Sequence, residues 1–273
     1  MNEKRQVVGC TVESIANMSD DSILTLPPPA PDKRIAYGKD PNQFGDLRLP
    51  KGSARAPIAV NVHGGFWRAR YDLAHASHLC AALTQAGVAT WNLEYRRLGN
   101  PGGGWPGSLQ DLSAGLKFID RFASDYHLDP GRTVVLGHSA GGQLALCLAS
   151  HSSKIRGVAA LAAVCDLRRA WELRLSNNAV SDFLGGSPNE VPEHYLEASP
   201  IELAIKVSQR IIHGTEDDIV PIELSRRYAQ KKAKSHEDVK LLEIPNAGHF
   251  ELIDPRTAAW KTVEQNILEL LGL

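Results

Sequence analysis

The chain alternates short apolar runs with longer amphipathic stretches, and this alternation restricts the possible folds more than any other feature. Strands are predicted at 58–63, 88–94, 133–137, 157–164, 210–214 and 239–244, and helices at 73–86, 108–124, 141–150, 222–234 and 256–271. Strands that alternate with helices favour a mostly parallel sheet with helices on both faces. The sequence therefore predicts an α/β fold in which the run GVAALAAV is a strand covered on both sides.

Most of the chain is expected to form one domain, because doubly wound α/β domains often reach 273 residues undivided. Residues 1–33 are predicted to be an N-terminal extension that ends in LPPPAPDK, and 34–273 the α/β domain. Between about 166 and 205 the alternation pauses. We expect this insertion to cap the carboxyl edge of the sheet, where such folds bind ligands; an ordinary surface excursion is the alternative.

Composition excludes some classes of partner. Thirty Lys and Arg residues balance 31 Asp and Glu residues, which argues against nucleic acid or an anionic membrane as the main partner. No stretch has the pattern of a signal peptide or a membrane span, so a cytoplasmic location is expected. Cys10, Cys80, Cys147 and Cys165 form no CxxC pair, and free thiols, including a structural Cys165, are predicted.

A lone serine lies between glycines in GHSAGG, directly after a predicted strand and before a predicted helix. Gly137-x-Ser139-x-Gly141 in that context matches the nucleophile-elbow pattern. Bulky side chains at the two glycine positions would collide with neighbouring backbone, and the following helix directs free N–H groups at developing negative charge. The sequence lacks the spacing of a phosphate-binding loop, GxxxxGK[ST] or GxGxxG, whereas a plain helix cap remains the alternative.

A nucleophilic serine needs a base and an acid that orients the base. The segment RIIHGTEDDIVP places Glu216, Asp217 and Asp218 after a strand, and LLEIPNAGHFELID places His249 after the last predicted strand. Serine, acid and histidine in this order suit the fold. Because the carboxyl ends of parallel strands converge, we expect these groups to lie near Ser139.

The segment VNVHGGFW follows an earlier strand and can supply donors for an oxyanion. The backbone N–H groups of Gly65 and Phe66, with that of Ala140, are the predicted donors, whereas His63 is expected to be structural. Trp67, Trp105 and His138 are candidates for the substrate pocket, with packing beneath the loops as the alternative. No histidine pairs with acids at metal-binding spacing, so neither metal nor organic cofactor is expected.

The motifs HGG-x-W (63–67), EYR (94–96), GHSAGG (137–142), HGTEDDIVP (213–221) and GHF (248–250) resemble those of the α/β-hydrolase superfamily. Within it, the chain is most similar to the esterase and arylformamidase (kynurenine formamidase-like) group, from about residue 35 to the end. The resemblance implies Ser139 as nucleophile, His249 as base and Asp217 as acid, with Asp218 and then Asp166 as further candidates for the acid.

The activity implied by the resemblance is that of a serine hydrolase, which cleaves a small carboxylic ester or an aryl-formamide through an acyl-enzyme. An exopeptidase-like hydrolase of the prolyl-oligopeptidase type is an alternative, although the chain has no room for that family's propeller domain. A non-catalytic ligand-binding module on a hydrolase scaffold is another, although such modules typically lack a triad member. The expected partner is a small-molecule ester or amide, with no nucleic acid and no membrane, and a homo-oligomer is compatible with the sequence.

Overall fold

The computed structural model describes residues 21–52 and 55–273 and contains an eight-stranded sheet. Its strands are β1 (Lys33–Ala36), β2 (Phe44–Arg48), β3 (Ala56–Val62), β4 (Ala89–Leu93), β5 (Leu128–His138), β6 (Gly157–Leu161), β7 (Ser208–Gly214) and β8 (Val239–Ile244). Their order is β1-β2-β4-β3-β5-β6-β7-β8, and β3 to β8 pair in parallel. The mostly parallel sheet predicted from the sequence is confirmed.

Several strands differ from the sequence prediction. The antiparallel strands β1 and β2 at one edge were not predicted. The strand predicted at 157–164 ends at Leu161 in the structure. Ala162 has a φ of 46°, a left-handed conformation that ends the extended run although its residues remain apolar.

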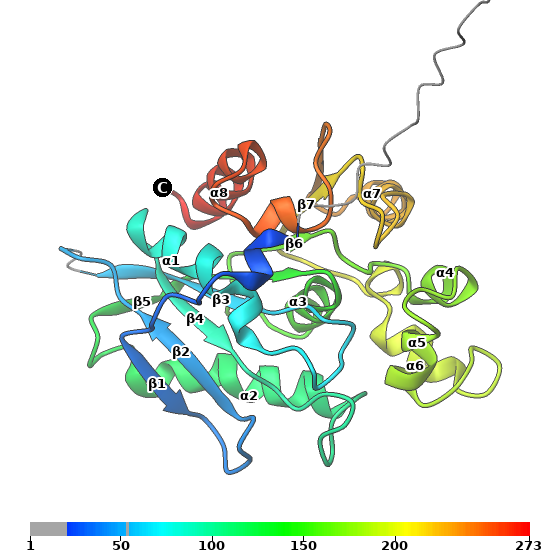
Figure 1. The fold of residues 1–273 in the computed structure, drawn as a ribbon, viewed down its shortest axis with the longest axis horizontal. Helices are drawn as coiled ribbons and strands as arrows, with labels where there is room; N and C mark the ends of the chain where they lie inside the picture. Colours follow the sequence, from blue (N-terminus) through cyan, green and yellow to red (C-terminus); the bar gives the residue numbers. More distant parts are fainter. Residues whose placement is uncertain (1–20, 53–54) are drawn as a thin grey trace, which may run out of the picture.

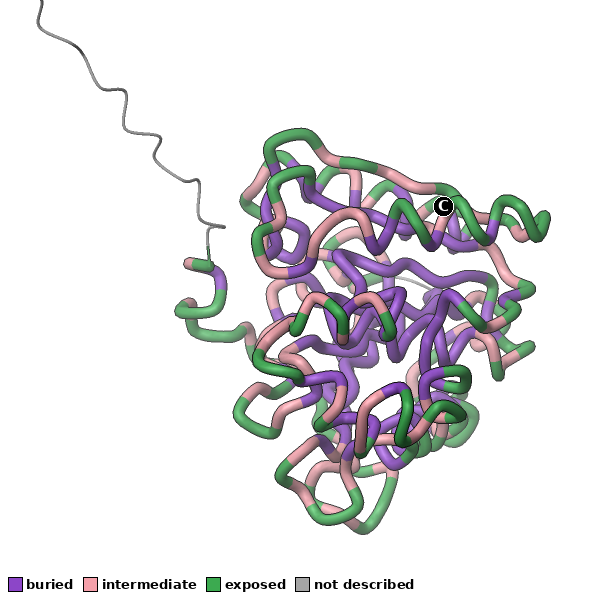
Figure 2. Tube along the Cα trace, turned by 90° about the vertical axis from the view of Figure 1, so that its right-hand side faces the viewer, coloured by how far each residue is buried: buried purple, intermediate pink, exposed green. Residues whose placement is uncertain are grey.

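Five long helices cover the two faces of the sheet (Figure 1). They are α1 (Ser77–Gln85), α2 (Gly107–Phe122), α3 (Ala140–Ser150), α7 (Glu223–Lys234) and α8 (Ala258–Leu271). Leu79 of α1 and Val263 of α8 belong to one hydrophobic core, whereas Leu112 of α2, Leu144 of α3 and Leu224 of α7 belong to the other. Figure 2 shows the buried residues gathered at the centre of the domain and the exposed residues on its outer segments.

The insertion at 166–205 folds into helices α4 (Leu167–Glu172), α5 (Ala179–Leu184) and α6 (Pro192–Ala198), followed by the 3-10 turn η3 (Pro200–Glu202). These helices lie together at one end of the molecule (Figure 1). Phe183 and Tyr195 are each 2% exposed and extend the core, and Trp171 is half-buried against it. The aromatic residues of the insertion therefore fix it to the domain.

The described cysteines are free thiols, as predicted. Cys80, Cys147 and Cys165 are buried and unpaired, and Cys10 lies outside the described residues. Burial raises the pKa of the Cys80 and Cys165 thiols to about 12, so both remain protonated at neutral pH. None of the described helices has the length and apolar character needed to cross a membrane.

Candidate active site

Ser139 occupies the turn between β5 and α3. Its φ of 57° and ψ of −122° are unfavourable for a residue with a side chain, and such strain is typical of functional turns. The backbone N–H of Ser139 donates to the carbonyl of Leu161 at 2.8 Å, which ties the turn to the end of β6. Its hydroxyl makes no capping hydrogen bond to α3, all of which is described. The geometry therefore matches an elbow and not a plain helix cap.

The glycines around Ser139 allow this turn to pack closely. A Cβ atom on Gly137 would lie 2.3 Å from the carbonyl oxygen of Gly141, and one on Gly141 would lie 2.2 Å from that of Val62. Both distances are far below van der Waals contact, so a side chain at either position would displace backbone. The collisions predicted from the sequence are confirmed.

Asp217 and His249 are brought together from the loops after β7 and β8. Oδ2 of Asp217 lies 2.7 Å from Nδ1 of His249, and the Asp217 side chain is fully buried. Oδ1 accepts the backbone N–H groups of Ile219 at 2.9 Å and Val220 at 2.8 Å. The carboxylate is thus held by its own loop while it orients the imidazole ring.

A second histidine contacts the same carboxylate. Nε2 of His213 lies 3.1 Å from Asp217 Oδ2 and 2.8 Å from the carbonyl of Val220, and Nδ1 lies 2.7 Å from the hydroxyl of Ser225. Burial raises the pKa of Asp217, but hydrogen bonds from His213 and His249 outweigh it and hold that pKa well below its usual range. Asp217 is therefore ionised at neutral pH.

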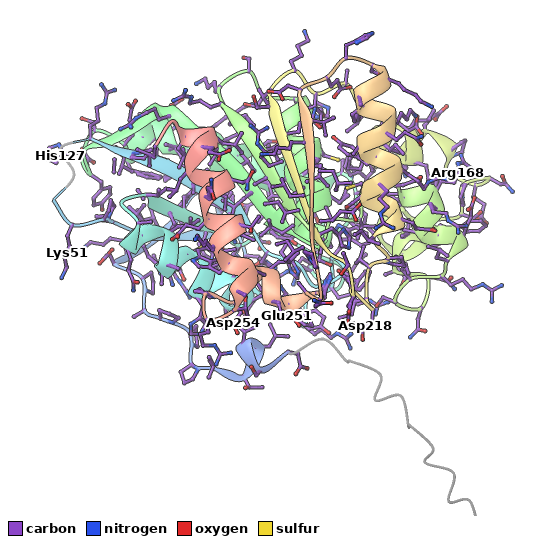
Figure 3. All side chains as sticks on the ribbon, turned by 90° about the horizontal axis from the view of Figure 1, so that it is seen from above. Lys51, His127, Arg168, Asp218, Glu251 and Asp254 are labelled. Carbon is purple, nitrogen blue, oxygen red and sulfur yellow. The ribbon has the colours of Figure 1, made fainter. Side chains whose placement is uncertain are left out.

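The other acids considered from the sequence lie elsewhere. Asp218 is exposed, on the molecular edge that also carries Glu251 (Figure 3). Asp166 accepts the backbone N–H of Arg169 at 3.0 Å, as the N-cap of α4, and lies 3.1 Å from Arg227. The geometry thus favours Asp217 as the partner of His249.

Ser139 and His249 line one pocket of about 240 Å³, together with Gly65 and Phe66. Eight further residues from different segments line it: Asp21, Leu24, Arg70, Tyr71, His75, Ser176, Ile219 and Phe250. None of these eight was singled out for the pocket from the sequence, although Ile219 and Phe250 lie within the motifs HGTEDDIVP and GHF. Their common feature is that they follow, or lie close to, the carboxyl ends of the parallel strands, where ligands bind in such folds.

The HGGF loop passes directly beside Ser139. A Cβ atom on Gly64 would lie 3.2 Å from that of Ser139, so this backbone is next to the nucleophile position. Gly65 and Phe66 have φ values of 107° and 47°. No hydrogen bond found among residues 21–52 and 55–273 uses the N–H of Gly65, Phe66 or Ala140. The three predicted donors are therefore unengaged by acceptors in the described chain.

Buried polar groups hold this loop from below. The hydroxyl of Tyr95 donates to the carbonyl of His63 at 2.9 Å. Nε2 of His63 lies 3.1 Å from Glu94 Oε1, and the His63 and Tyr95 rings stack with centroids 4.6 Å apart. Burial raises the pKa of Glu94, but His63 and Arg97 hold it below its usual range. His63 is thus structural, and the EYR motif supports the loop.

The three side chains suggested for the pocket do not line it. Trp67 is fully buried, with its ring 4.4 Å from that of Phe183 and its Nε1 donating to Gln143 Oε1 at 2.9 Å. Trp105 is half-buried, edge-on to Phe183 at 6.2 Å, and His138 is 1% exposed. These positions favour the alternative of packing beneath the loops.

His138 instead links two other histidines. Its Nε2 donates to the backbone carbonyl of His249 at 3.0 Å, so its Nδ1 accepts from Nε2 of His75 at 2.9 Å. Burial lowers the pKa of His75 to about 3 and that of His138 well below its usual value, so both rings are neutral at pH 7. This chain of hydrogen bonds fixes the backbone of His249 relative to the elbow.

The insertion reaches the pocket through Ser176. Arg68, in the loop after β3, donates to the Ser176 carbonyl at 2.7 Å and to its hydroxyl at 3.2 Å.

Within the described residues, no cluster of three or more His, Cys, Asp or Glu side chains is arranged to hold a metal ion. The pocket brings the Ser139 hydroxyl and the His249 imidazole together, with the Asp217 carboxylate bound to that imidazole.

Comparisons with solved structures identify the fold. A truncated form of a carbohydrate esterase from gut microbiota superposes with a TM-score of 0.77 over 88% of this chain and 95% of its own, at 21% identity. Esterase B from Lactobacillus rhamnosis, solved in an inhibited form, gives 0.78 over 92% and 90%, at 18% identity. The chain therefore has the α/β-hydrolase fold.

Sequence comparisons give further relatives. A protein of Oryza sativa named "Probable isoprenylcysteine alpha-carbonyl methylesterase" is 22% identical over 88% of this chain and 63% of its own. Esterase LipQ of Mycobacterium tuberculosis is 25% identical over 80% of this chain and 56% of its own. The chain thus spans less than two-thirds of the length of these curated relatives. The family model described as BD-FAE matches residues 46–231, more than half of the sequence, and the chain belongs to the BD-FAE family of α/β-hydrolases.

Proposed function

We propose that the protein is a serine hydrolase that cleaves small carboxylic esters. The observation that carries the proposal is the meeting, at one small pocket, of a strained Ser139 with His249, whose Nδ1 lies 2.7 Å from the buried carboxylate of Asp217. A nucleophile, a base and an orienting acid are the parts that acyl transfer requires. The esterase names of its relatives and structural neighbours are consistent with this chemistry.

In the proposed reaction, Nε2 of His249 takes the proton of Ser139 as the hydroxyl oxygen attacks the ester carbonyl. The bond to the leaving alcohol then breaks, and that alcohol takes the proton from His249. Water repeats the sequence on the acyl-enzyme and releases the acid and free Ser139. Asp217, ionised at neutral pH, holds the imidazole with its Nδ1–H toward the carboxylate and stabilises the imidazolium.

The negative charge of the tetrahedral intermediate needs preorganised donors. We assign this role to the backbone N–H groups of Gly65, Phe66 and Ala140, which have no acceptor within the described chain. Ala140 is the first residue of α3, so the positive end of that helix adds to the stabilisation. Loss of one such donor costs about 100- to 1,000-fold in kcat in comparable sites.

The pocket volume supports a small substrate. About 240 Å³ is below the roughly 300–1,000 Å³ of pockets for drug-sized ligands. The proposed substrates are therefore esters of short acids. Aryl-formamides, which the resemblance to arylformamidases suggests, are the substrate class to test against them.

The test compares kcat/KM for p-nitrophenyl acetate and N-formylkynurenine in wild type, Ser139→Ala and the surface control Ser153→Ala. We expect ester turnover in wild type and the control, and a loss of at least about 1,000-fold in Ser139→Ala. A fluorophosphonate should label wild type and not Ser139→Ala, which separates an enzyme from a binding module. A loss of less than tenfold would refute the role of Ser139, and preference for the formamide by orders of magnitude would replace the ester.

A further inference from the structure

The segment before β1 forms part of the pocket. Asp21 and Leu24 line the same cavity as Ser139 and His249, although more than 100 residues separate the two pairs in sequence. Leu24 belongs to the 3-10 turn η1 (Ser22–Thr25). Residues 21–32, here named the arm, therefore cross the catalytic edge of the sheet before the first strand begins.

Several contacts hold the arm in this position. Ile23 is 3% exposed and belongs to the core cluster that also contains Leu252 and Ile253, residues of the turn η4 (Phe250–Ile253) directly after His249. The Ser22 hydroxyl accepts from Nη2 of Arg256 at 2.9 Å. Figure 3 shows η1 against the edge that carries Glu251 and Asp254. The arm is thus anchored to the loop that supplies the proposed base.

Hydrogen bonds also hold the C-terminal end of the arm. Nη2 of Arg48, a buried side chain of β2, donates to the carbonyl of Pro29 at 2.7 Å. The backbone N–H of Leu49 donates to Asp32 Oδ2 at 2.7 Å. Consecutive prolines at 27–29 and Pro31 restrict the backbone between these anchors. An arm fixed at both ends presents Leu24 to the pocket in one position.

Leu24 is more exposed than most large apolar residues of the described chain. It is 39% exposed, and the other large exposed hydrophobic residues within the described ranges are Leu196 and Leu273. Leu24 lines the pocket that contains the proposed nucleophile. An apolar group in that place loses its contact with water when an ester chain enters, which favours binding.

We propose that Leu24 is a specificity-determining residue, which forms the wall that limits the chain length of the ester bound at Ser139. This inference rests on the proposed esterase function. Each substrate methylene that gains a buried place when this wall is shortened is worth about fourfold in kcat/KM. A shorter side chain at position 24 extends the space available to the acyl chain of the substrate, and a larger side chain fills that space.

The experiment measures kcat/KM for p-nitrophenyl acetate, butyrate and hexanoate in wild type, Leu24→Ala and Leu24→Trp. The ratio of hexanoate to acetate should rise at least fivefold in Leu24→Ala and fall at least fivefold in Leu24→Trp, since two or more methylenes are affected at about fourfold each. Leu196→Ala and Leu196→Trp are matched controls, because Leu196 is 54% exposed on α6 and does not line the pocket. Their ratios should equal that of wild type.

A second measurement uses Ile23→Asp, a variant designed to release the arm from the core. It places a charge in the core position that holds the arm, and the chain-length ratio should move in the direction of Leu24→Ala, with the melting temperature of the domain recorded alongside. Ratios within twofold of wild type in both Leu24 variants would overturn the inference while leaving the esterase proposal intact. A wild type without any Ser139-dependent ester turnover would overturn the proposed function and this inference together.

Discussion

Asp217→Asn is the substitution that most directly tests the site geometry. The wild-type carboxylate accepts four hydrogen bonds: Oδ1 from the N–H groups of Ile219 and Val220, and Oδ2 from His249 and His213. An asparagine has one acceptor oxygen. If that oxygen keeps the two backbone donors, its NH₂ group faces the two histidines, both of which present N–H groups in wild type.

The two histidines respond differently to this change. His213 Nε2 also lies 2.8 Å from the Val220 carbonyl, so it keeps an acceptor. His249 instead adopts the tautomer in which Nδ1 accepts from the amide and Nε2 carries the proton. That ring has no lone pair with which to take the proton of Ser139. In serine proteases, replacing the triad aspartate by asparagine lowers kcat by about 10⁴-fold for the same reason, which corresponds to about 5.4 kcal/mol.

The assay is kcat for p-nitrophenyl acetate between pH 6 and 9, with circular dichroism to confirm folding. Asp218→Asn is the matched control, because it alters the adjacent, exposed carboxylate, and its kcat should stay within about threefold of wild type, as for surface changes generally. A loss of less than tenfold in Asp217→Asn, or an equal loss in Asp218→Asn, would refute the assignment of the acid.

Two further predictions concern stability. Gly137→Ala places a Cβ atom 2.3 Å from the Gly141 carbonyl oxygen, so we expect it to lower the free energy of unfolding by about 1–3 kcal/mol or more in urea titrations; an unchanged midpoint would contradict the close packing of the elbow. Burial lowers the pKa of His75 to about 3, against about 6.5 for an unfolded histidine. Between these values protons bind the unfolded chain only, so stability falls as pH falls, by about 2 kcal/mol at pH 5. His75→Gln should lose about 2 kcal/mol less than wild type between pH 7.5 and pH 5, and equal losses would contradict the lowered pKa of His75.

The parallel strands β3 to β7 could be predicted because they are largely buried and read as apolar runs. β8 lies at the edge of the sheet and is not buried, but its run VKLLEI still carries a strand pattern. β1 and β2 could not be predicted. The burial of β1 is slight, and β2 carries Asp46 and Arg48, which are 2% and 3% exposed. Asp46 is paired with Arg34 at 2.7 Å, a partner on the neighbouring strand. Charged residues that are buried through such long-range pairing leave no apolar signal in the sequence.

The candidate site also has features that could be predicted from the sequence and features that could not. Ser139, Asp217 and His249 lie in motifs whose spacing reflects local turns, so their convergence could be predicted from strand order. The walls of the pocket depend on contacts between distant segments. Trp67 looked like a wall residue from its place in the HGG-x-W motif, but its stacking partner Phe183 lies in the insertion. His75 had no motif at all.

The link between the HGGF loop and the insertion has a consequence for how this chain can diverge. Arg68 binds the backbone carbonyl of Ser176, and Trp67 stacks on Phe183, so the inserted helices are joined to the loop that holds the proposed oxyanion donors. The carbonyl contact can be made by any residue at 176, and only the second contact, at 3.2 Å, uses the Ser176 hydroxyl. The ring contact instead requires an aromatic or similarly flat group at 183. Natural variants should therefore vary more at position 176 than at 183, which should co-vary with position 67, so that the insertion can acquire new outward surfaces while its attachment to the catalytic loop persists.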